Sequence, residues 1–255
     1  EVSIALMLLV STGLLVRSLR AMQTFDQGLK TEDVSGGMFT LNSQQRYGTP
    51  EKILGFTHAM LERVQGLPDV DSACVTVGYP SAGNRGRVQQ RGFILEGGHV
   101  PSSPSELGLT TDRYAVTPEY FRVMGVPLIR GRTFDSHDTT TTTRVVIVNR
   151  EMVRLHFPDK DPIGQRIRLL ENHLGQADSP AKPAPEIWSE IIGVVGDVKP
   201  RGPTSPTQPQ VYELFDQSPQ QLMTVVMKAK GVAPGLSPAV RDIVHSLDKD
   251  IRFEQ

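Results

Sequence analysis

The hydrophobic pattern of the chain begins with an uncharged apolar run and changes abruptly after it. Residues Val2 to Val16 read VSIALMLLVSTGLLV, whereas the sequence after Arg17 has the mixed composition of a soluble domain. A helix that crosses a bilayer needs about 20 predominantly apolar residues. The run is shorter, but the chain starts at Glu1 without an initiator methionine, so we expect a membrane helix that is truncated upstream.

Two other interpretations of the run fit its sequence less well. A signal peptide would place basic residues before the apolar run and an A-x-A-like cleavage site after it. Here Arg17 and Arg20 follow the run, and the segment SLRAMQ offers no such site. A buried core helix would show a polar face, but the only polar residues in the run are Ser3, Ser11 and Thr12. A membrane anchor is the favoured interpretation.

Apolar residues continue at helical spacing beyond the run. Leu19, Met22 and Phe25 fall on one face of a helix, and Gly28 provides a stop signal. The sequence therefore predicts the end of a transmembrane helix and its outward stalk over residues 1–27.

A strand-helix-strand unit is predicted directly after the stalk. Residues 33–41 and 70–77 read as strands, and Thr49-Pro50 starts a helix with a capping residue followed by proline at the first helical position. A wide apolar stripe supports this helix, and Gly66-Leu67-Pro68 ends it.

The C-terminal end of the chain repeats this arrangement. Residues 222–229 and 251–253 read as strands, and Ser237-Pro238 caps the helix between them. The exits from the two helices, VQGLPDV and VHSLDKDI, resemble each other. A split repeat of this kind indicates a small α/β subdomain with a second body inserted into it.

The middle of the chain is richer in Gly, Pro, Ser and Thr and predicts short elements. Thr117-Pro118-Glu119 opens one short helix, and Asn149 caps a second that ends near His156. Strand candidates lie at residues 92–96, 113–116, 144–148, 165–170 and 187–198. Loops that we expect to be mobile lie at residues 81–88, 139–143 and 171–185.

Three stretches carry a specific resemblance to a known family. They are residues 114–134 (YAVTPEYFRVMGVPLIRGRTF), 145–167 (VVIVNREMVRLHFPDKDPIGQRI) and 191–198 (IIGVVGDV). In this order, behind an apolar helix, they resemble the MacB-like periplasmic core domain of the FtsX-like ABC transporter permease superfamily. The resemblance runs from Leu15 to Phe253 and is closest to the second core domain of permeases that contain two such units.

The resemblance implies a fold of class α+β with two parts behind the transmembrane and stalk helix of residues 1–27. A porter-like subdomain of two strand-helix-strand units would comprise residues 28–79 and 208–255. An inserted, mixed α/β subdomain, similar to the part called Sabre, would comprise residues 80–207. The split repeat read from the residues agrees with this division.

The resemblance also implies a function and a location. The domain would couple ATPase-driven motion through the stalk helix to the export or handling of substrates on the periplasmic side of the bacterial inner membrane. The implied partners are a cytoplasmic ATPase subunit, reached through the rest of the permease, a second permease unit and a periplasmic adaptor.

The charge of the chain argues against nucleic acid as a partner, and its cysteine content excludes internal disulfides and cysteine-based zinc sites. The formal net charge is −1, from 27 basic and 28 acidic residues, so the chain lacks the global positive field that holds nucleic acid at physiological salt. Cys74 is the single cysteine, which excludes an internal disulfide and a cysteine-based zinc cluster. Because Cys74 lies in a predicted strand, we expect it to be buried and unreactive.

The sequence lacks the common motifs of P-loop nucleotide-binding proteins, zinc proteases and serine hydrolases. The sequence has no G-x-x-x-x-G-K-[ST], H-E-x-x-H or G-x-S-x-G motif, so any ATP hydrolysis must belong to a partner. Residues 193–197 (GVVGD) contain glycine but read as a strand end rather than a dinucleotide-binding loop. We expect no catalytic, cofactor-binding or metal-binding residues, and no enzyme.

Two acidic clusters were the strongest candidates for a metal site. Asp135, His137 and Asp138 could together hold a divalent metal, but a polar turn is the preferred interpretation because one flexible loop rarely fixes a coordination geometry. Asp159 and Asp161 resemble the start of a calcium loop, but the later Gly and Glu positions are missing. Asp159 and Asp161 are therefore interpreted as turn residues.

Two alternative functions share the predicted anchor. An extracytoplasmic ligand-sensing domain of a membrane signalling protein is the main one, and a membrane-tethered hydrolase is a third class. The flanking sequence separates them, because further apolar helices after Gln255 indicate a permease and a kinase or cyclase module indicates a sensor.

Overall fold

The computed structural model describes residues 11–13, 17, 28–29, 33–78, 88–99, 109–173, 186–200, 205–231 and 236–254. Within these residues no helix combines the length and the apolar character needed to cross a bilayer. The predicted membrane helix and stalk lie almost entirely outside the described residues, which include only 11–13 and 17 of that segment.

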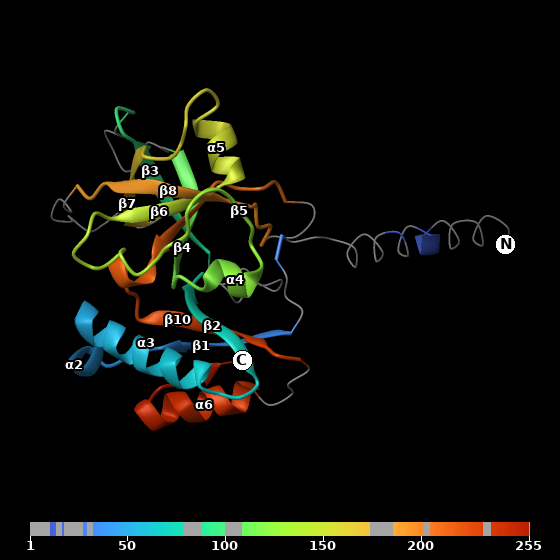
Figure 1. Cartoon of the computed structure of the whole chain (residues 1–255), viewed down its shortest axis with the longest axis vertical. Coiled ribbons are helices and arrows are strands. Elements are labelled where there is room, and N and C mark those ends of the chain that lie inside the picture. The colour runs from blue at the N-terminus through green and yellow to red at the C-terminus, as the bar shows by residue number, and fades with distance from the viewer. Residues whose placement is uncertain are drawn as a thin grey trace.

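The body has two parts, which we call the sheet layer and the ring (Figure 1). The sheet layer has the strand order β11-β1-β10-β2, all antiparallel. Its strands are β1 (Val34–Thr40), β2 (Val70–Val77), β10 (Leu222–Ala229) and β11 (Phe253–Glu254). Since β10 lies between β1 and β2, strands from both ends of the sequence share one sheet.

Two helices cover one face of the sheet layer, α3 (Pro50–Gln65) and α6 (Leu236–Leu247) (Figure 1). Thr49 is the N-cap of α3 and Pro50 its first residue, as predicted. Phe56, Met60 and Val64 recur every four residues along α3 and are buried against the sheet. Helix α6 begins at Leu236, just before the predicted Ser237 cap.

A polar network fastens the end of α6 to the short helix α2 (Gln44–Tyr47). The guanidinium of Arg46 donates to Asp248 Oδ1 at 2.7 Å, and the hydroxyl of Tyr47 donates to Asp248 Oδ2 at 2.8 Å. Burial, reinforced by that hydrogen bond, raises the pKa of Tyr47 to about 12. The hydrogen bond from Arg46 lowers the pKa of Asp248 below its usual value. The network therefore joins the N-terminal and C-terminal units through one buried carboxylate.

Acid should weaken this network selectively. Because the folded pKa of Asp248 is depressed, its contribution to stability is complete above the ordinary carboxyl pKa of about 4 and is lost as the pH falls through the lower folded value. The thermal stabilities of the native chain and of Asp248→Asn should differ most at neutral pH and converge as the pH falls below about 4. A stability difference that is constant across this range would contradict the ionised-carboxylate account.

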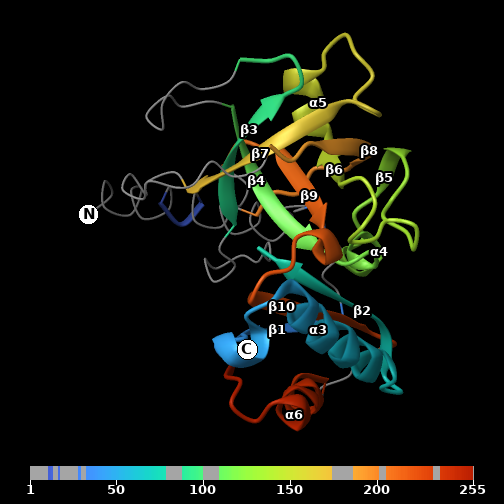
Figure 2. The ribbon, with the colours of Figure 1, turned by 90° about the vertical axis from the view of Figure 1, so that its left-hand side faces the viewer.

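Six strands of the other part close on themselves to form the ring (Figure 2). Their order is β4-β3-β7-β8-β6-β9, and β9 returns to β4 in a parallel pairing. The strands are β3 (Gln89–Leu95), β4 (Leu109–Val116), β6 (Val145–Asn149), β7 (Arg166–His173), β8 (Ser189–Val195) and β9 (Gln210–Leu214). Strand β5 (Leu128–Gly131) adds to β8 outside the ring.

An apolar cluster joins the ring to the sheet layer. It surrounds α4 (Tyr120–Met124), where the side chains of Tyr120 and Phe121 each contact the aromatic side chain of Tyr212. The same cluster contains Cys74 from β2 and Val226 from β10. The strands also connect directly, because Thr76 and Val77 of β2 pair with Val116 and Ala115 of β4. The two parts thus share both a core and a sheet.

Cys74 is fully buried in β2, as predicted. Burial raises the pKa of its thiol far above the usual value, so the reactive thiolate is not populated at neutral pH.

Several details differ from the sequence-based expectations. Residues 210–214 form β9 and pair inside the ring, so the boundary expected at 207/208 falls after this strand. The 139–143 loop, expected to be mobile, is held by hydrogen bonds from Gln217 to the carbonyl groups of Thr139 and Thr143. The 171–185 loop is shorter than expected because residues 171–173 belong to β7. Most of the 81–88 loop lies outside the described residues.

Candidate functional site: the root of the N-terminal segment

The N-terminal segment meets the body at Gly28 and Leu29, which lie against the turn that follows β8. Gly28 has φ +74°, and a Cβ placed there would overlap the carbonyl oxygen of Asp197. Leu29 packs against the apolar cluster around α4. We call Gly28, Leu29, Asp197 and Val198 the root. The approach is so close that only glycine fits at position 28.

The carboxylate of Asp197 fixes the turn to helix α5 (Arg150–His156). Its Oδ1 atom accepts from Asn149 Nδ2 at 2.8 Å and from the backbone N–H of Glu151 at 2.9 Å. Asn149 Oδ1 accepts from the N–H of Met152 at 3.0 Å, which confirms Asn149 as the predicted helix cap. Asp197 and Asn149 together satisfy backbone donors that the helix start leaves open.

Gln210 of β9 holds the other side of the turn. Its side-chain amide donates to the carbonyl of Val198 at 2.8 Å and accepts from the Val198 N–H at 3.3 Å. Its own backbone N–H donates to Asn149 Oδ1 at 2.9 Å. Gln210 and Asn149 are fully buried, so these bonds are shielded from water. The root therefore rests on a turn that is tied to β9 and α5 at once.

The sequence placed Asn149 and the GVVGD strand end correctly but did not predict that they meet. Strand β8 ends at Val195, as the strand-end interpretation of residues 193–197 requires. The available signal was a polar residue, Asp197, directly after a buried strand, together with a capping asparagine after another. Because these two strands are far apart in sequence, only their parallel pairing brings the residues together.

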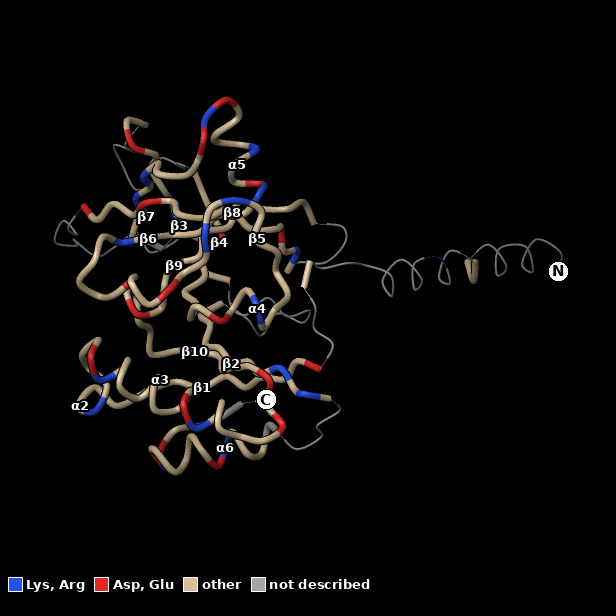
Figure 3. Tube along the Cα trace, viewed as in Figure 1, with Lys and Arg blue, Asp and Glu red and all other residues tan. Residues whose placement is uncertain are grey.

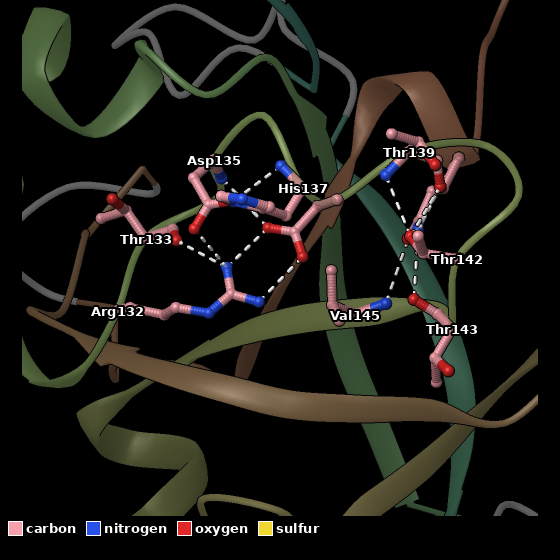
Figure 4. Close-up of polar contacts among 10 residues, drawn as sticks. Arg132, Thr133, Asp135, His137, Thr139, Thr142, Thr143 and Val145 are labelled. Atoms are coloured by element: carbon pink, nitrogen blue, oxygen red, sulfur yellow. Dashed lines mark hydrogen bonds and ion pairs between the residues drawn. The ribbon is translucent and has the colours of Figure 1, made fainter.

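Asp135, His137 and Asp138 come together with Arg132 in an ion-paired turn, and Figure 4 shows Arg132, Asp135 and His137 of this group. The guanidinium of Arg132 donates to both carboxylate oxygens of Asp138, at 2.6 and 2.8 Å, and these hydrogen bonds lower the pKa of Asp138. Asp135 accepts from the backbone N–H of His137 at 2.8 Å, which lowers the pKa of Asp135. A metal would have to displace Arg132. Within the described residues, no group of three or more His, Cys, Asp or Glu side chains is arranged to hold a metal ion.

Asp161 also acts as a turn residue. Its Oδ1 atom accepts from the N–H of Ile163 at 3.0 Å, and its other oxygen pairs with Arg130 of β5 at 2.5 Å. The carboxylate thus fixes the backbone before Gly164 and holds the edge strand beside it.

A buried charge pair that the sequence did not reveal lies between ring strands. Arg113 of β4 pairs with Glu213 of β9, and their side chains are only 7% and 10% exposed. Arg113 also donates to Gln89 Oε1 at 2.8 Å and to Ser218 Oγ at 2.6 Å. The only sequence signal is a charged residue in the middle of each strand, which many exposed strands share.

Charge on the remaining surface is mixed. Acidic and basic residues are interspersed over both parts of the body (Figure 3). Many exposed arginines are paired locally, as Arg154 is with Glu151 and Arg166 with Glu96. Exposed pairs of this kind contribute little stability but leave no concentrated positive field for a polyanion.

Solved structures with a similar fold come from extracytoplasmic regions of transporters. The periplasmic region of MacB from Actinobacillus actinomycetemcomitans matches with a TM-score of 0.53 and 14% sequence identity, covering 89% of this chain and 90% of that chain. The extracellular domain of the noncanonic ABC-type transporter YknZ from Gram-positive bacteria matches with a TM-score of 0.50 and 12% identity, covering 87% of this chain and 100% of that chain. At these identities the likeness establishes the fold.

Sequence comparison gives a shorter but closer match. The macrolide export ATP-binding/permease protein MacB of Neisseria gonorrhoeae is 37% identical over 66 residues, which is 26% of this chain and 10% of that protein. The matched region is thus about a tenth of the length of this relative. The model of the MacB-like periplasmic core domain family matches residues 2–240. Since that match covers nearly the whole chain, the protein belongs to the MacB-like periplasmic core domain family.

Proposed function

We propose that the chain is the extracytoplasmic domain of an ABC-type permease in the bacterial inner membrane. In this proposal it acts as a lever that carries ATPase-driven motion through the predicted helix of residues 1–27. The observation that supports it is the root, where Gly28 lies in contact with the Asp197 turn. A segment that only tethered the domain would not need to pass so close to the carbonyl of Asp197 that only glycine fits. Nor would it need to rest on a turn that hydrogen bonds hold in place.

Displacement of the N-terminal segment would act directly on the Asp197 turn of the ring and on the apolar cluster that joins the ring to the sheet layer. Gly28 and Leu29 contact the Asp197 turn and the α4 cluster, whereas the sheet layer begins at Val34. The turn is fastened to α5 by Asp197 and to β9 by Gln210. Motion of the root would therefore move β8, α5 and β9 together rather than bend a loop.

The proposed partners follow from what the chain contains. It has no P-loop motif, so ATP would be hydrolysed by a cytoplasmic ATPase unit. A second permease unit and a periplasmic adaptor are further proposed partners. The role is mechanical and substrate-handling rather than enzymatic, and the polar clusters at Asp138 and Asp161 serve as structural turns.

The lever can be broken without touching the body. In the predicted helix of residues 1–27, Met22→Pro in the full permease would remove a helical hydrogen bond and clash with the preceding turn, at a cost of about 3 kcal/mol or more. Met22 lies outside the described residues and before the root, so the body should stay folded while ATP-coupled activity is lost. Met22→Leu is the matched control and should keep activity. Full activity in a normally inserted Met22→Pro permease would favour a passive tether.

A further inference from the structure

The chain returns from the ring to the sheet layer through the 3-10 helix η1 (Phe215–Gln217), and this crossover contacts both parts. We propose that residues 215–218 form a coupling joint, in which a change at α3 of the sheet layer alters the 139–145 segment of the ring. This coupling lies within the body and is measured without transport, so its failure would not be a failure of the proposed function.

The first two residues of the joint engage the sheet layer. Phe215 is fully buried in the core beneath α3. The Asp216 carboxylate lies 3.1 Å from Nε2 of His58, which projects from α3. Asp216 is partly buried, with 29% of its side chain exposed. One apolar and one polar contact thus fix this half of η1 to the helix layer.

The next two residues engage the ring. Gln217 Oε1 accepts from the N–H of Val145, the first residue of β6, at 3.0 Å. Gln217 Nε2 donates to the carbonyl of Thr139 at 2.8 Å and to that of Thr143 at 3.2 Å. Ser218 Oγ accepts from Arg113 of β4 at 2.6 Å. One buried side chain, Gln217, therefore satisfies one donor and two carbonyl acceptors of the ring.

The 139–145 segment is held by this joint, by its own turn and by strand β8, where the carbonyl of Arg144 accepts from the N–H of Glu190 at 2.8 Å. Its internal hydrogen bonds are short-range, such as Thr139 N–H to Thr142 Oγ1 at 2.9 Å (Figure 4). Thr139, Thr141 and Thr142 are exposed. Because successive residues on η1 face different parts, a shift at Asp216 must tilt Gln217 or break its bonds. The N–H of Val145 is the natural reporter, since Gln217 is its hydrogen-bond acceptor.

Hydrogen exchange of the Val145 amide in the full chain tests the joint. Gln217→Ala should raise its exchange rate by about tenfold, because the N–H loses its acceptor. His58→Ala removes the contact between α3 and Asp216 and should raise the same rate by about threefold through Asp216. Glu62→Ala is the matched control on the exposed side of α3, one turn further along, and should leave the rate unchanged.

Two further variants separate coupling from general loosening. The double variant His58→Ala/Gln217→Ala should exchange at the rate of Gln217→Ala alone, because the path runs through Gln217. Gln217→Glu keeps an acceptor oxygen and should retain Val145 protection while it loses the bonds to Thr139 and Thr143. An unchanged Val145 rate in a folded His58→Ala chain, or additive effects in the double variant, would overturn the proposal.

Discussion

Replacing Glu213 with alanine should lower the free energy of unfolding by about 3–5 kcal/mol, because it leaves the buried guanidinium of Arg113 without its counter-charge. Both side chains are almost fully enclosed between β4 and β9. The remaining partners of Arg113, Gln89 and Ser218, are neutral and cannot replace the carboxylate. Urea unfolding of the full chain, followed by the fluorescence of its single tryptophan, Trp188, measures the change.

Two controls identify the cause of that loss. Glu213→Gln keeps an oxygen acceptor for Arg113 and should lose less stability than Glu213→Ala. The double replacement Arg113→Met/Glu213→Leu removes both charges and should recover most of the stability, because apolar pairs of similar volume often substitute for buried ion pairs. A loss below about 1 kcal/mol in Glu213→Ala would show that water or a neighbouring group already compensates the arginine.

Gly28→Ala should uncouple the N-terminal segment from the ring while leaving the ring folded. The added Cβ overlaps the carbonyl of Asp197, and the left-handed φ of +74° disfavours any residue with a side chain. Four hydrogen bonds with Asn149, Glu151 and Gln210 hold the Asp197–Val198 turn in place, so the root rather than the turn must move. We expect at least a tenfold fall in ATP-coupled activity of the full permease, with a small change in thermal stability.

Gly164→Ala is the matched control for this variant. Gly164 has a similar φ of +80°, but a Cβ there meets nothing within 4 Å. It should lose about 1 kcal/mol of stability from backbone strain and keep its coupled activity. Equal activity loss in both variants would mean that strain, rather than the contact with Asp197, is responsible. Full activity in Gly28→Ala would show that the close contact between Gly28 and Asp197 is not needed for coupling.

The sequence predicted most strands and helices because their signals are local. Thr49-Pro50 and Asn149 mark helix starts, and the structure confirms both positions, although only Asn149 makes a side-chain capping hydrogen bond. The sequence analysis predicts neither strand β9 nor helix η1, because their sequence, QVYELFDQ, has no glycine or proline to divide it and shows no clear strand or helix period. Without the pairing of β9 to β4 and β6, residues 208–221 look like an extension of the C-terminal unit.

The candidate site was harder to predict than the fold. Gly28 was interpreted as a helix stop, but its role depends on Asp197, a residue 169 positions away in the sequence. Similarly, the 139–143 threonines look mobile until Gln217 is placed beside them by the return of the chain. Long-range contacts of this kind follow from topology, which composition and periodicity do not specify.

We expect the predicted helix of residues 1–27 and the ring to move as one rigid unit. Pulsed electron paramagnetic resonance tests it with spin labels at Arg17→Cys and Lys160→Cys in the assembled permease, since the buried native Cys74 does not compete for label. Arg17 and Lys160 are both exposed. If the helix and the ring move as one unit, the distance between the two labels has one narrow distribution, which is the same in the nucleotide-free and ATP-bound states. A broad distribution, or one that shifts when ATP binds, would contradict it.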